Sequence, residues 1–250
     1  MIICKSPAEI EKLRRSGRTA RAILEEMRDS VKPGVTTLDL ERQAEKRLAA
    51  LGARAAFKGY RGYPCNLCAS VNEEIIHGIP SGRRLAEGDI VSLDMGVILD
   101  GYYGDSALTV PVGKISEPLA RLLRVTEESL ELAIQKVKLG NRLGDVSATV
   151  QEYAEKNGYN VVREFVGHGI GRELHEEPQV PNYGEFGRGP VLKEGMVLAI
   201  EPMVTERSQA LRVLADNWTA VTIDGGYSAH FEHMVAVTRN GPDVLTRLGT

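Results

Sequence analysis

LAEGDIVSLDMGVILDGYYGDSALTVPV, residues 85–112, carries the clearest structural signal in the chain. At its centre stands Asp100-Gly101, a dipeptide typical of the two-residue turn that joins antiparallel strands. The segments 89–99 and 102–112 on either side are rich in hydrophobic and β-branched residues, as strands are. The sequence therefore predicts a β-hairpin, and a two-residue turn fixes which residues of the two strands face each other.

The register of this hairpin brings two carboxylates to one face. Asp105 lies opposite Gly96 and diagonal to Asp94, so the two acids converge. Small residues around them leave room, whereas the other face carries a hydrophobic set that belongs in a core: Leu93, Met95, Val97, Leu108 and Val110. We interpret the carboxylate face as the floor of a pocket.

Two segments of the chain recur at a nearly constant spacing. The first match is between LAEGDIVSLD (85–94) and LKEGMVLAIE (192–201). The second is between VKPGVTTLDLERQAEKRLAALG (31–52) and VKLGNRLGDVSATVQEYAEKNG (137–158), and both of these segments have the pattern of a turn followed by a helix. Two unrelated helices after similar turns would explain part of this, but a duplicated unit is the simplest explanation. It predicts halves of about 1–115 and 116–250, each with two helices followed by strands.

The first helix is expected near residues 7–30. Ser6, Pro7 and Glu9 have the pattern of an N-cap, a first-turn proline and a capping-box acid. The hydrophobic residues after them recur at helical spacing: Ile10, Leu13, Ala20 and Ile23. Helices and antiparallel strands together predict an α+β fold.

The overall composition excludes several classes of protein. With 250 residues, 42% of them hydrophobic and 26% charged, the chain can bury a large core, in one domain or in two halves. The net charge of −3 and the absence of long runs of like charge make nucleic acid an unfavoured partner. No hydrophobic stretch is long enough for a membrane span, and no signal peptide is recognisable, so we expect a cytoplasmic protein.

The cysteines point to a reducing compartment. Cys4, Cys65 and Cys68 cannot form a disulfide framework. The last two make a CxxC pair, but a structural zinc site needs two further soft ligands, and none is found nearby.

Four carboxylates fall within hydrophobic, strand-like runs. Besides the two of the hairpin, Glu201 lies in MVLAIEPMV (196–204) and Glu232 in AHFEHMVAV (229–237). Burying a carboxylate without a partner reduces the stability of the fold by roughly several kcal/mol. A cation is therefore required to compensate the charge. For a single acid, a salt bridge to a loop residue would suffice, and the basic candidates are Lys58, Arg61 and Arg172.

The four acids together with His168, in VGHGIG (166–171), instead form a ligand set for divalent metal ions. Four negative charges balance about two dications, and two ions about 3.5–4 Å apart activate a shared water for hydrolysis. Oxygen ligands with one imidazole favour manganese, iron(II) or cobalt over a structural zinc site, while zinc in a catalytic role stays open.

With Asp94, Asp105, His168, Glu201 and Glu232 in this order, the whole chain resembles a type I methionine aminopeptidase. The strings that carry the resemblance are FKGYRGYP (57–64), SVNEEIIHGIP (70–80), DMGVILDGYYGDS (94–106), GHGIGRELHEEP (167–178), IEPM (200–203) and FEH (231–233). The resemblance implies the pita-bread fold, in which two pseudo-symmetric halves surround a curved, mostly antiparallel sheet with helices outside. Residues 1–250 would then form a single catalytic domain.

The family implies both an activity and a metal arrangement. Its members hydrolyse the initiator methionine from nascent proteins and prefer a small second residue. This chain would meet such N-termini at the ribosome, and we expect it to be a monomer. Two divalent ions per chain (Co²⁺, Mn²⁺, Fe²⁺ or Zn²⁺) would be bound, one by Asp94, Asp105 and Glu232, the other by Asp105, His168, Glu201 and Glu232.

Further roles follow from family positions. His77 and His175 would contact the substrate, with His175 steadying the carbonyl oxygen or the tetrahedral intermediate. The residues alone favour a turn histidine and a loop histidine, and the resemblance to the family reverses that preference. Glu201 is the candidate general base, or only a ligand. HEEPQ is not a zincin motif, because Gln179 replaces the second histidine and Pro178 would break the helix.

The methionine pocket implied by the family contains aromatic rings and a sulfur, which suit a thioether: Phe57, Tyr60, Tyr63, Cys68, Leu174 and Trp218. Phe57 stands where a cysteine is frequent, and Leu174 where an aromatic residue is, so the width of the pocket stays open. His230 stands where glutamine is common, and it would line the rim or bind metal.

Two other functions compete with this one. Prolidases and aminopeptidase P share the ligands and the fold but usually have a large N-terminal domain, which this sequence does not include. Non-catalytic binding modules of the same fold typically lose metal ligands, whereas all five are present here. Only 30 residues separate Glu201 from Glu232, too few for the insertion that marks type II enzymes.

Overall fold

The hairpin predicted at Asp100-Gly101 forms the centre of the molecule. In the computed structural model, which describes residues 1–249, strand β4 (Ile90–Leu99) pairs antiparallel with β5 (Tyr102–Pro111). Gly96 faces Asp105, so the predicted register is confirmed. Asp100 and Gly101 both have positive φ, 51° and 78°, as a type I′ turn requires.

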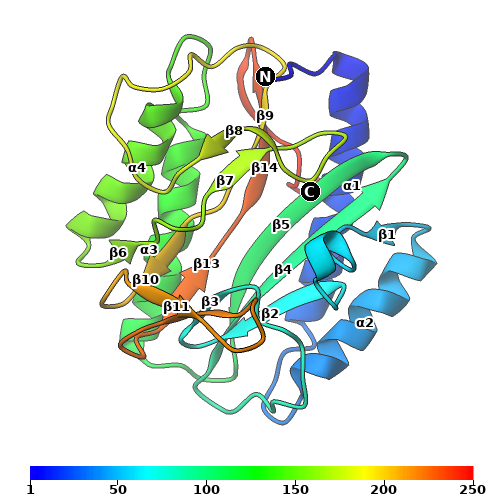
Figure 1. The fold of residues 1–250 in the computed structure, drawn as a ribbon, viewed down its shortest axis with the longest axis vertical. Coiled ribbons are helices and arrows are strands. Elements are labelled where there is room, and N and C mark those ends of the chain that lie inside the picture. Colours follow the sequence, from blue (N-terminus) through cyan, green and yellow to red (C-terminus); the bar gives the residue numbers. More distant parts are fainter. Residues whose placement is uncertain (250) are drawn as a thin grey trace.

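In the described part of the chain, four α-helices lie outside the strands. α1 (Pro7–Arg28) and α2 (Thr37–Ala50) lie on one side of the molecule, and α3 (Glu117–Ile134) and α4 (Leu143–Lys156) on the other (Figure 1). α1 begins at the capping box that was expected: Ser6 accepts from the Glu9 backbone, and the Glu9 side chain accepts from Ser6. It ends at Arg28, two residues before the predicted end.

The strands of residues 1–249 form four small antiparallel sheets. One contains β1 (Arg54–Ala55), β4, β2 (Leu67–Val71) and β5, and a second is ordered β15 (Gly241–Val244), β14 (His233–Thr238), β9 (Val197–Ile200), β7 (Gly167–Gly169), β8 (Glu176–Val180). The third is β13 (Ser228–His230), β10 (Met203–Thr205), β6 (Asn160–Val161), and the fourth β11 (Leu211–Val213), β12 (Ala220–Thr222), β3 (Glu74–Ile76). A short 3₁₀ helix, η1 (Tyr60–Gly62), precedes β2.

The two halves repeat each other in detail. α4 begins and ends 106 residues after α2. The backbone N–H of Gly34 donates to Leu85, and that of Gly140 donates to Leu192, at the corresponding positions. We therefore keep the division at about 1–115 and 116–250 as a proposal, which these repeated hydrogen bonds support; residue 250 itself lies outside the described residues.

Two of the strand-like runs that contain an acid are each divided into two strands. β9 ends at Ile200 and β10 begins at Met203, while β13 ends at His230 and β14 begins at His233. Glu201 and Glu232 therefore lie between strands rather than within the strand-like runs 196–204 and 229–237 that the sequence indicated. Pro202 lacks an N–H for a ladder, and the Glu232 N–H donates instead to Ala107 of β5, at 3.0 Å.

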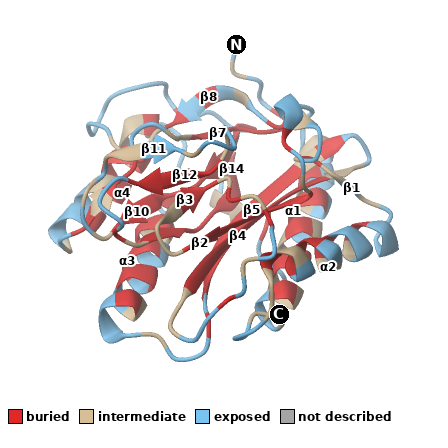
Figure 2. Ribbon diagram, turned by 60° about the horizontal axis from the view of Figure 1, so that its bottom comes forward, coloured by how far each residue is buried: buried red, intermediate tan, exposed pale blue. Residues whose placement is uncertain are grey.

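The central strands are buried and the helices keep an exposed outer face (Figure 2). Packing of α1 on β5 is very close: a Cβ on Gly104 would lie 2.2 Å from the backbone carbon of Ser16, so only glycine fits there. This close packing gives the acids of the hairpin a rigid base.

No helix among the described residues is long and hydrophobic enough to cross a membrane.

Candidate metal centre and substrate pocket

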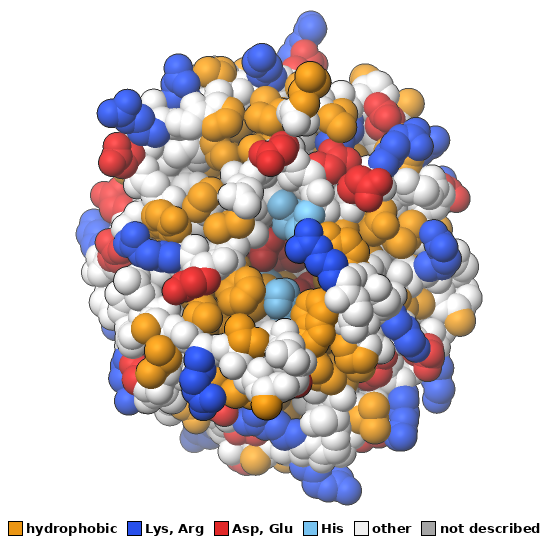
Figure 3. Space-filling view, in the orientation of Figure 1, with side chains coloured by type: hydrophobic (Ala, Val, Ile, Leu, Met, Phe, Trp, Pro, Cys, Tyr) orange, Lys and Arg blue, Asp and Glu red, His pale blue; other side chains and the backbone are white. Residues whose placement is uncertain are grey.

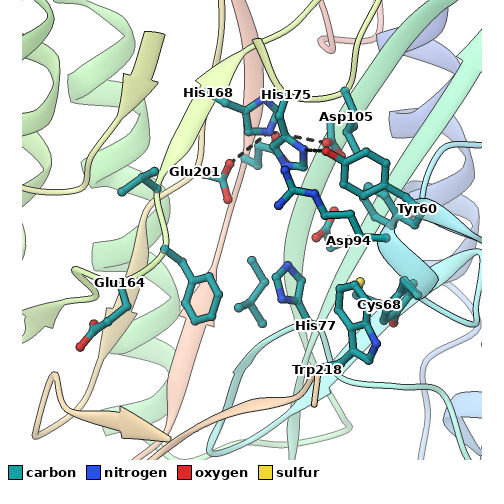
Figure 4. Close-up of a pocket in the computed structure, with 18 residues that line it drawn as sticks. Tyr60, Cys68, His77, Asp94, Asp105, Glu164, His168, His175, Glu201 and Trp218 are labelled. Carbon is teal, nitrogen blue, oxygen red and sulfur yellow. Dashed lines mark hydrogen bonds and ion pairs between the residues drawn. The ribbon is translucent and has the colours of Figure 1, made fainter. Parts of the chain in front are cut away.

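The five predicted ligands line one cavity, although they come from five separate places in the sequence (Figure 4). Asp94 and Asp105 stand on the hairpin, and Glu201 and Glu232 in the two strand breaks. His168, from β7, points its Nε2 at the acids: this atom is 3.5 Å from Glu201 Oε1 and 3.9 Å from Asp105 Oδ2. Ligand atoms of Asp105, His168 and Glu232 all lie within 4.8 Å of one another.

The carboxylates are buried without enough partners. Asp94 Oδ1, Asp105 Oδ1 and Glu232 Oε1 are buried and accept no hydrogen bond. Burial, reinforced by the neighbouring acids, raises the pKa of Asp94, Glu201 and Glu232 well above the usual range, and burial raises that of Asp105 to about 7. Unpaired buried acceptors that repel one another are the environment that a bound cation would stabilise.

His168 is prepared to act as a neutral ligand. Its Nδ1 donates to the carbonyl oxygen of Gly169 at 2.9 Å, which leaves the lone pair of Nε2 toward the carboxylates. Burial, and next His175, lower the pKa of His168 to about 3. The imidazole is therefore uncharged at neutral pH, the form that binds metals.

Salt bridges do not replace the cation. Lys58 pairs with Glu45 at 3.4 Å, Arg172 is 3.9 Å from Glu9, and Arg61 has no carboxylate within 4.0 Å among the described residues. The alternative in which basic side chains neutralise the four acids was therefore wrong. The donor set of carboxylate oxygens and one imidazole fits divalent metal ions.

The cavity of about 280 Å³ continues from the acids into a mostly hydrophobic pocket. All six residues expected for a methionine pocket line it: Phe57, Tyr60, Tyr63, Cys68, Leu174 and Trp218. Figure 3 shows histidines and carboxylates deep in a hollow with hydrophobic side chains around it. Cys68 pairs with Asp94 across β2 and β4, so this thiol lies beside the acids.

Tyr63 and Trp218 of the pocket hold each other in place. The rings of Tyr63 and Trp218 meet edge to face with centroids 5.1 Å apart. The Tyr63 hydroxyl donates to the carbonyl oxygens of Leu67 and Gly78, at 3.0 and 3.1 Å. These contacts give the pocket wall a fixed shape before a substrate arrives.

Both predicted substrate histidines also line the cavity. His175 lies against His168, with ring centroids 4.3 Å apart, and shares a hydrogen bond of 2.8 Å between its Nδ1 and the Tyr60 hydroxyl. His77 has a left-handed backbone with φ of 61°, and its ring lies edge-on to Phe165 at 5.3 Å. A strained backbone at such a position is common in functional sites.

The loop that carries Leu174 and His175 is fixed by a buried ion pair that sequence reasoning missed. Glu176 accepts the backbone N–H of Arg172 at 2.9 Å and forms an ion pair with the Lys5 ammonium. The side chains of Lys5 and Glu176 are only 4% and 8% exposed. No local pattern signals this pair, because the two residues lie 171 positions apart.

Other lining residues were also missed. Arg61, Ile76, Glu164, Phe165 and Val166 complete the cavity wall. The position of 165–166 directly before the GHGIG string was the available signal for two of them.

His230 is not at the rim, contrary to expectation. It is 1% exposed, does not line the cavity, and its Nε2 lies 3.7 Å from Glu201 Oε2 without a hydrogen bond. β13 ends at His230, and the imidazole lies beside Glu201 rather than on the cavity wall. Within residues 1–249, Cys65 and Cys68 are free thiols and belong to no group of metal-ligating side chains.

The chain is similar to known proteins over nearly its full length. Residues 11–239 match metallopeptidase family M24. Methionine aminopeptidase 1 of Bacillus subtilis (strain 168) is 52% identical over 248 residues, which are 99% of this chain and 100% of the relative. The structure of methionine aminopeptidase from Thermotoga maritima has a TM-score of 0.98 at 50% identity and covers 99% of this chain and 100% of its own.

A prolidase from Pyrococcus furiosus is less similar. It has a TM-score of 0.81 at 25% identity, and the match covers 99% of this chain but 66% of the prolidase. Together with the observed α+β architecture of antiparallel sheets between pairs of helices, these structures confirm the pita-bread fold that the sequence resemblance implied.

Proposed function

The chain is a member of metallopeptidase family M24, and from this premise we propose that it is a metal-dependent methionine aminopeptidase. It removes the initiator methionine from nascent proteins whose second residue is small. The substrates are the N-termini of polypeptides leaving the ribosome, which places the reaction in the cytoplasm. One observation carries the proposal: a single cavity joins four buried acids and a neutral imidazole to a pocket of aromatic rings and a thiol.

Metal ions would be held at the acidic end of this cavity. In our proposal Asp94, Asp105 and Glu232 bind one ion, and Asp105, His168, Glu201 and Glu232 a second. When bound, divalent ions supply a water acidic enough to attack at neutral pH and a positive charge that polarises the carbonyl. The unpaired oxygens of Asp94, Asp105 and Glu232 support this arrangement. The identity of the metal stays open among manganese, iron, cobalt and zinc.

The pocket would select methionine by shape and polarisability. The rings of Tyr63 and Trp218 and the sulfur of Cys68 offer a soft, hydrophobic surface for a thioether. Because one cavity joins this pocket to the acids, a peptide whose first side chain fills the pocket would bring its first peptide bond to the acids, as in an exopeptidase. Phe57 and Leu174 line this pocket and set its width.

The remaining polar groups would act on the scissile amide. Glu201 accepts the proton of the attacking water on its carboxylate. His175, held by the Tyr60 hydroxyl, stabilises the carbonyl oxygen as negative charge develops there. His77 contacts the substrate from the opposite wall, between the rings of Phe165 and Trp218.

The decisive experiment compares peptides that begin with methionine and peptides with proline at the second position. We expect protein loaded with Mn²⁺ or Co²⁺ to cleave Met-Ala-Ser, to cleave Met-Leu-Ser far more slowly, and to leave Ala-Pro-Ser intact. Cleavage of Ala-Pro-Ser without cleavage of Met-Ala-Ser would favour a prolidase instead. Peptide binding without cleavage of either would favour a non-catalytic binding module.

A further inference from the structure

A basic side chain stands at the mouth of the cavity. Arg61, in η1, is the only lysine or arginine among the described residues that line the cavity, and it is exposed. In Figure 3 a basic side chain reaches over the hollow in which the histidines and acids lie. The guanidinium carbon of Arg61 is 5.4 Å from the ring centroid of Tyr60, which hydrogen-bonds to His175.

Nothing in the described part of the chain neutralises this charge. Arg61 has no carboxylate within 4.0 Å there. Glu164 lines the same cavity, but its carboxylate points away from the metal-site residues in Figure 4. In the proposed metal-loaded enzyme the two dications balance the four buried acids, so Arg61 is the positive side-chain charge that a substrate meets at the mouth.

The backbone of Arg61 is also unusual. Its φ of 48° and ψ of 22° lie in the left-handed region, where a side chain costs about 1–2 kcal/mol relative to glycine. Glycine at this position would avoid the strain, and the neighbouring residues Gly59 and Gly62 both have positive φ. Strain that is retained at the edge of a binding site points to a function for the side chain that carries it.

The location of Arg61 indicates which part of a substrate it meets. The first residue of the substrate fills the pocket, and His175 lies at the scissile carbonyl. The guanidinium of Arg61 lies over the ring of Tyr60, whose hydroxyl bonds to His175, so it stands next to the histidine on the side of the cavity mouth, where the chain beyond the cleaved bond would leave. The second residue of the substrate is small, so the third is the first whose side chain can carry a charge. Each extended residue spans about 3.3–3.6 Å, which an arginine side chain can bridge.

We propose that Arg61 is a specificity-determining residue that favours an acidic side chain at the third position of the substrate. The inference rests on the proposed function and adds a charge preference to it. Exposed ion pairs are weak, so the preference is modest: about two- to fivefold in kcat/KM between glutamate and glutamine, and again between glutamine and lysine. Screening in high salt reduces it.

The test uses three hexapeptide amides, Met-Ala-Xaa-Gly-Ala-Ala with Xaa as Glu, Gln or Lys. Amidation removes the terminal carboxylate, which is the other anion that Arg61 could bind. We expect kcat/KM to decrease in the order Glu, Gln, Lys for the wild type and for Arg61→Lys, and to be equal for Arg61→Gln. Arg61→Glu should reverse the order. Neither glutamine nor lysine changes the backbone strain, so a difference between these variants reports the charge.

Lys58→Gln is the matched control. Lys58 lies three residues earlier on the same segment, is exposed and does not line the cavity, so its removal changes the net charge equally but should keep the ranking. An equal kcat/KM for all three peptides in the wild type, or an unchanged ranking in Arg61→Gln, would overturn the inference while leaving the aminopeptidase activity intact. Failure to cleave any of the three would instead contradict the proposed function.

Discussion

The residues of the site gain their chemistry from burial. Asp105 is 4% exposed and stands among three other buried acids, so its carboxylate is costly unless a cation is bound. His168 is neutral instead of charged, and the hydrogen bond from its Nδ1 to Gly169 selects the tautomer whose Nε2 faces the acids. The site therefore combines buried negative charge with one neutral nitrogen atom.

Asp105→Asn is the sharpest single change. It removes one of the two proposed bridging charges, so we expect turnover of Met-Ala-Ser to fall by at least about a hundredfold, and bound metal to decrease. The metal-free variant should unfold at a temperature equal to or above that of the metal-free wild type, because a buried charge is gone. Activity assays, metal analysis and thermal unfolding in chelator measure these effects. Full activity with undiminished metal would show that Asp105 is not a ligand.

At the scale of elements, the loop 170–175 between β7 and β8 is fixed by contacts with other parts of the chain. Lys5, which precedes α1, reaches the Glu176 carboxylate, and Glu176 also accepts the Arg172 backbone N–H. The backbone N–H of Lys5 in turn donates to Gly195 at 2.7 Å. The segment before α1 is thus joined to the loop that carries Leu174 and His175 on the cavity wall.

Breaking this buried pair should cost both stability and activity. We expect Lys5→Met to lower the free energy of unfolding by about 3–5 kcal/mol, because Glu176 is left without its cation. The double variant Lys5→Met/Glu176→Gln should recover much of that loss, as paired removal usually does. Urea unfolding measures the free energies of unfolding. In the activity assay with Met-Ala-Ser, we expect kcat to decrease by a larger factor than KM changes. Equal stability of Lys5→Met and the wild type would mean that the pair does not hold the loop.

The contact between α1 and β15 predicts a pH dependence. Arg14 donates two hydrogen bonds to Asp243, at 2.9 and 2.7 Å, and these bonds lower the pKa of Asp243. A carboxyl group with a lowered pKa stabilises the fold above its unfolded value of about 3.9, and this contribution is lost as the pH falls through the folded pKa. Because the side chain of Asp243 is 36% exposed, solvent screening keeps the contribution below about 1 kcal/mol.

Asp243→Asn should therefore be less stable than the wild type at pH 7, and the difference should shrink toward zero below about pH 4. Thermal unfolding of both proteins between pH 3 and 7 measures this difference in stability. The other acids titrate in both proteins, so their contribution cancels in the difference. A difference that grows on acidification would contradict the sign argued here.

The sequence predicted those features that depend on neighbours along the chain. Asp100-Gly101 determined the hairpin and its register, and Ser6 with Glu9 determined the start of α1. The breaks at Glu201 and Glu232 could not be predicted, because they depend on contacts with the distant hairpin, such as the hydrogen bond to Ala107. The pairing of Lys5 with Glu176 was hidden for the same reason.

At the scale of the whole molecule, the site lies between the two proposed halves of the chain. Asp94 and Glu201 occupy the ends of the two copies of a repeated segment, and Asp105 and Glu232 stand on or beside the strands that pair with those copies, β5 and β14. Each half thus brings two acids to the shared cavity, and the helices lie outside it (Figure 1). Neither half alone holds four converging carboxylates, so metal binding should stabilise the assembly of both.

Chelator-treated protein can be titrated with Mn²⁺ while bound metal, unfolding temperature and cleavage of Met-Ala-Ser are measured on the same samples. We expect no cleavage without metal, and cleavage that rises together with the unfolding temperature as up to about two ions per chain bind. Asp105→Asn serves as the control and should show neither rise. Full cleavage by wild-type protein that contains no bound ion would contradict the conclusion that these buried acids exist to hold metal.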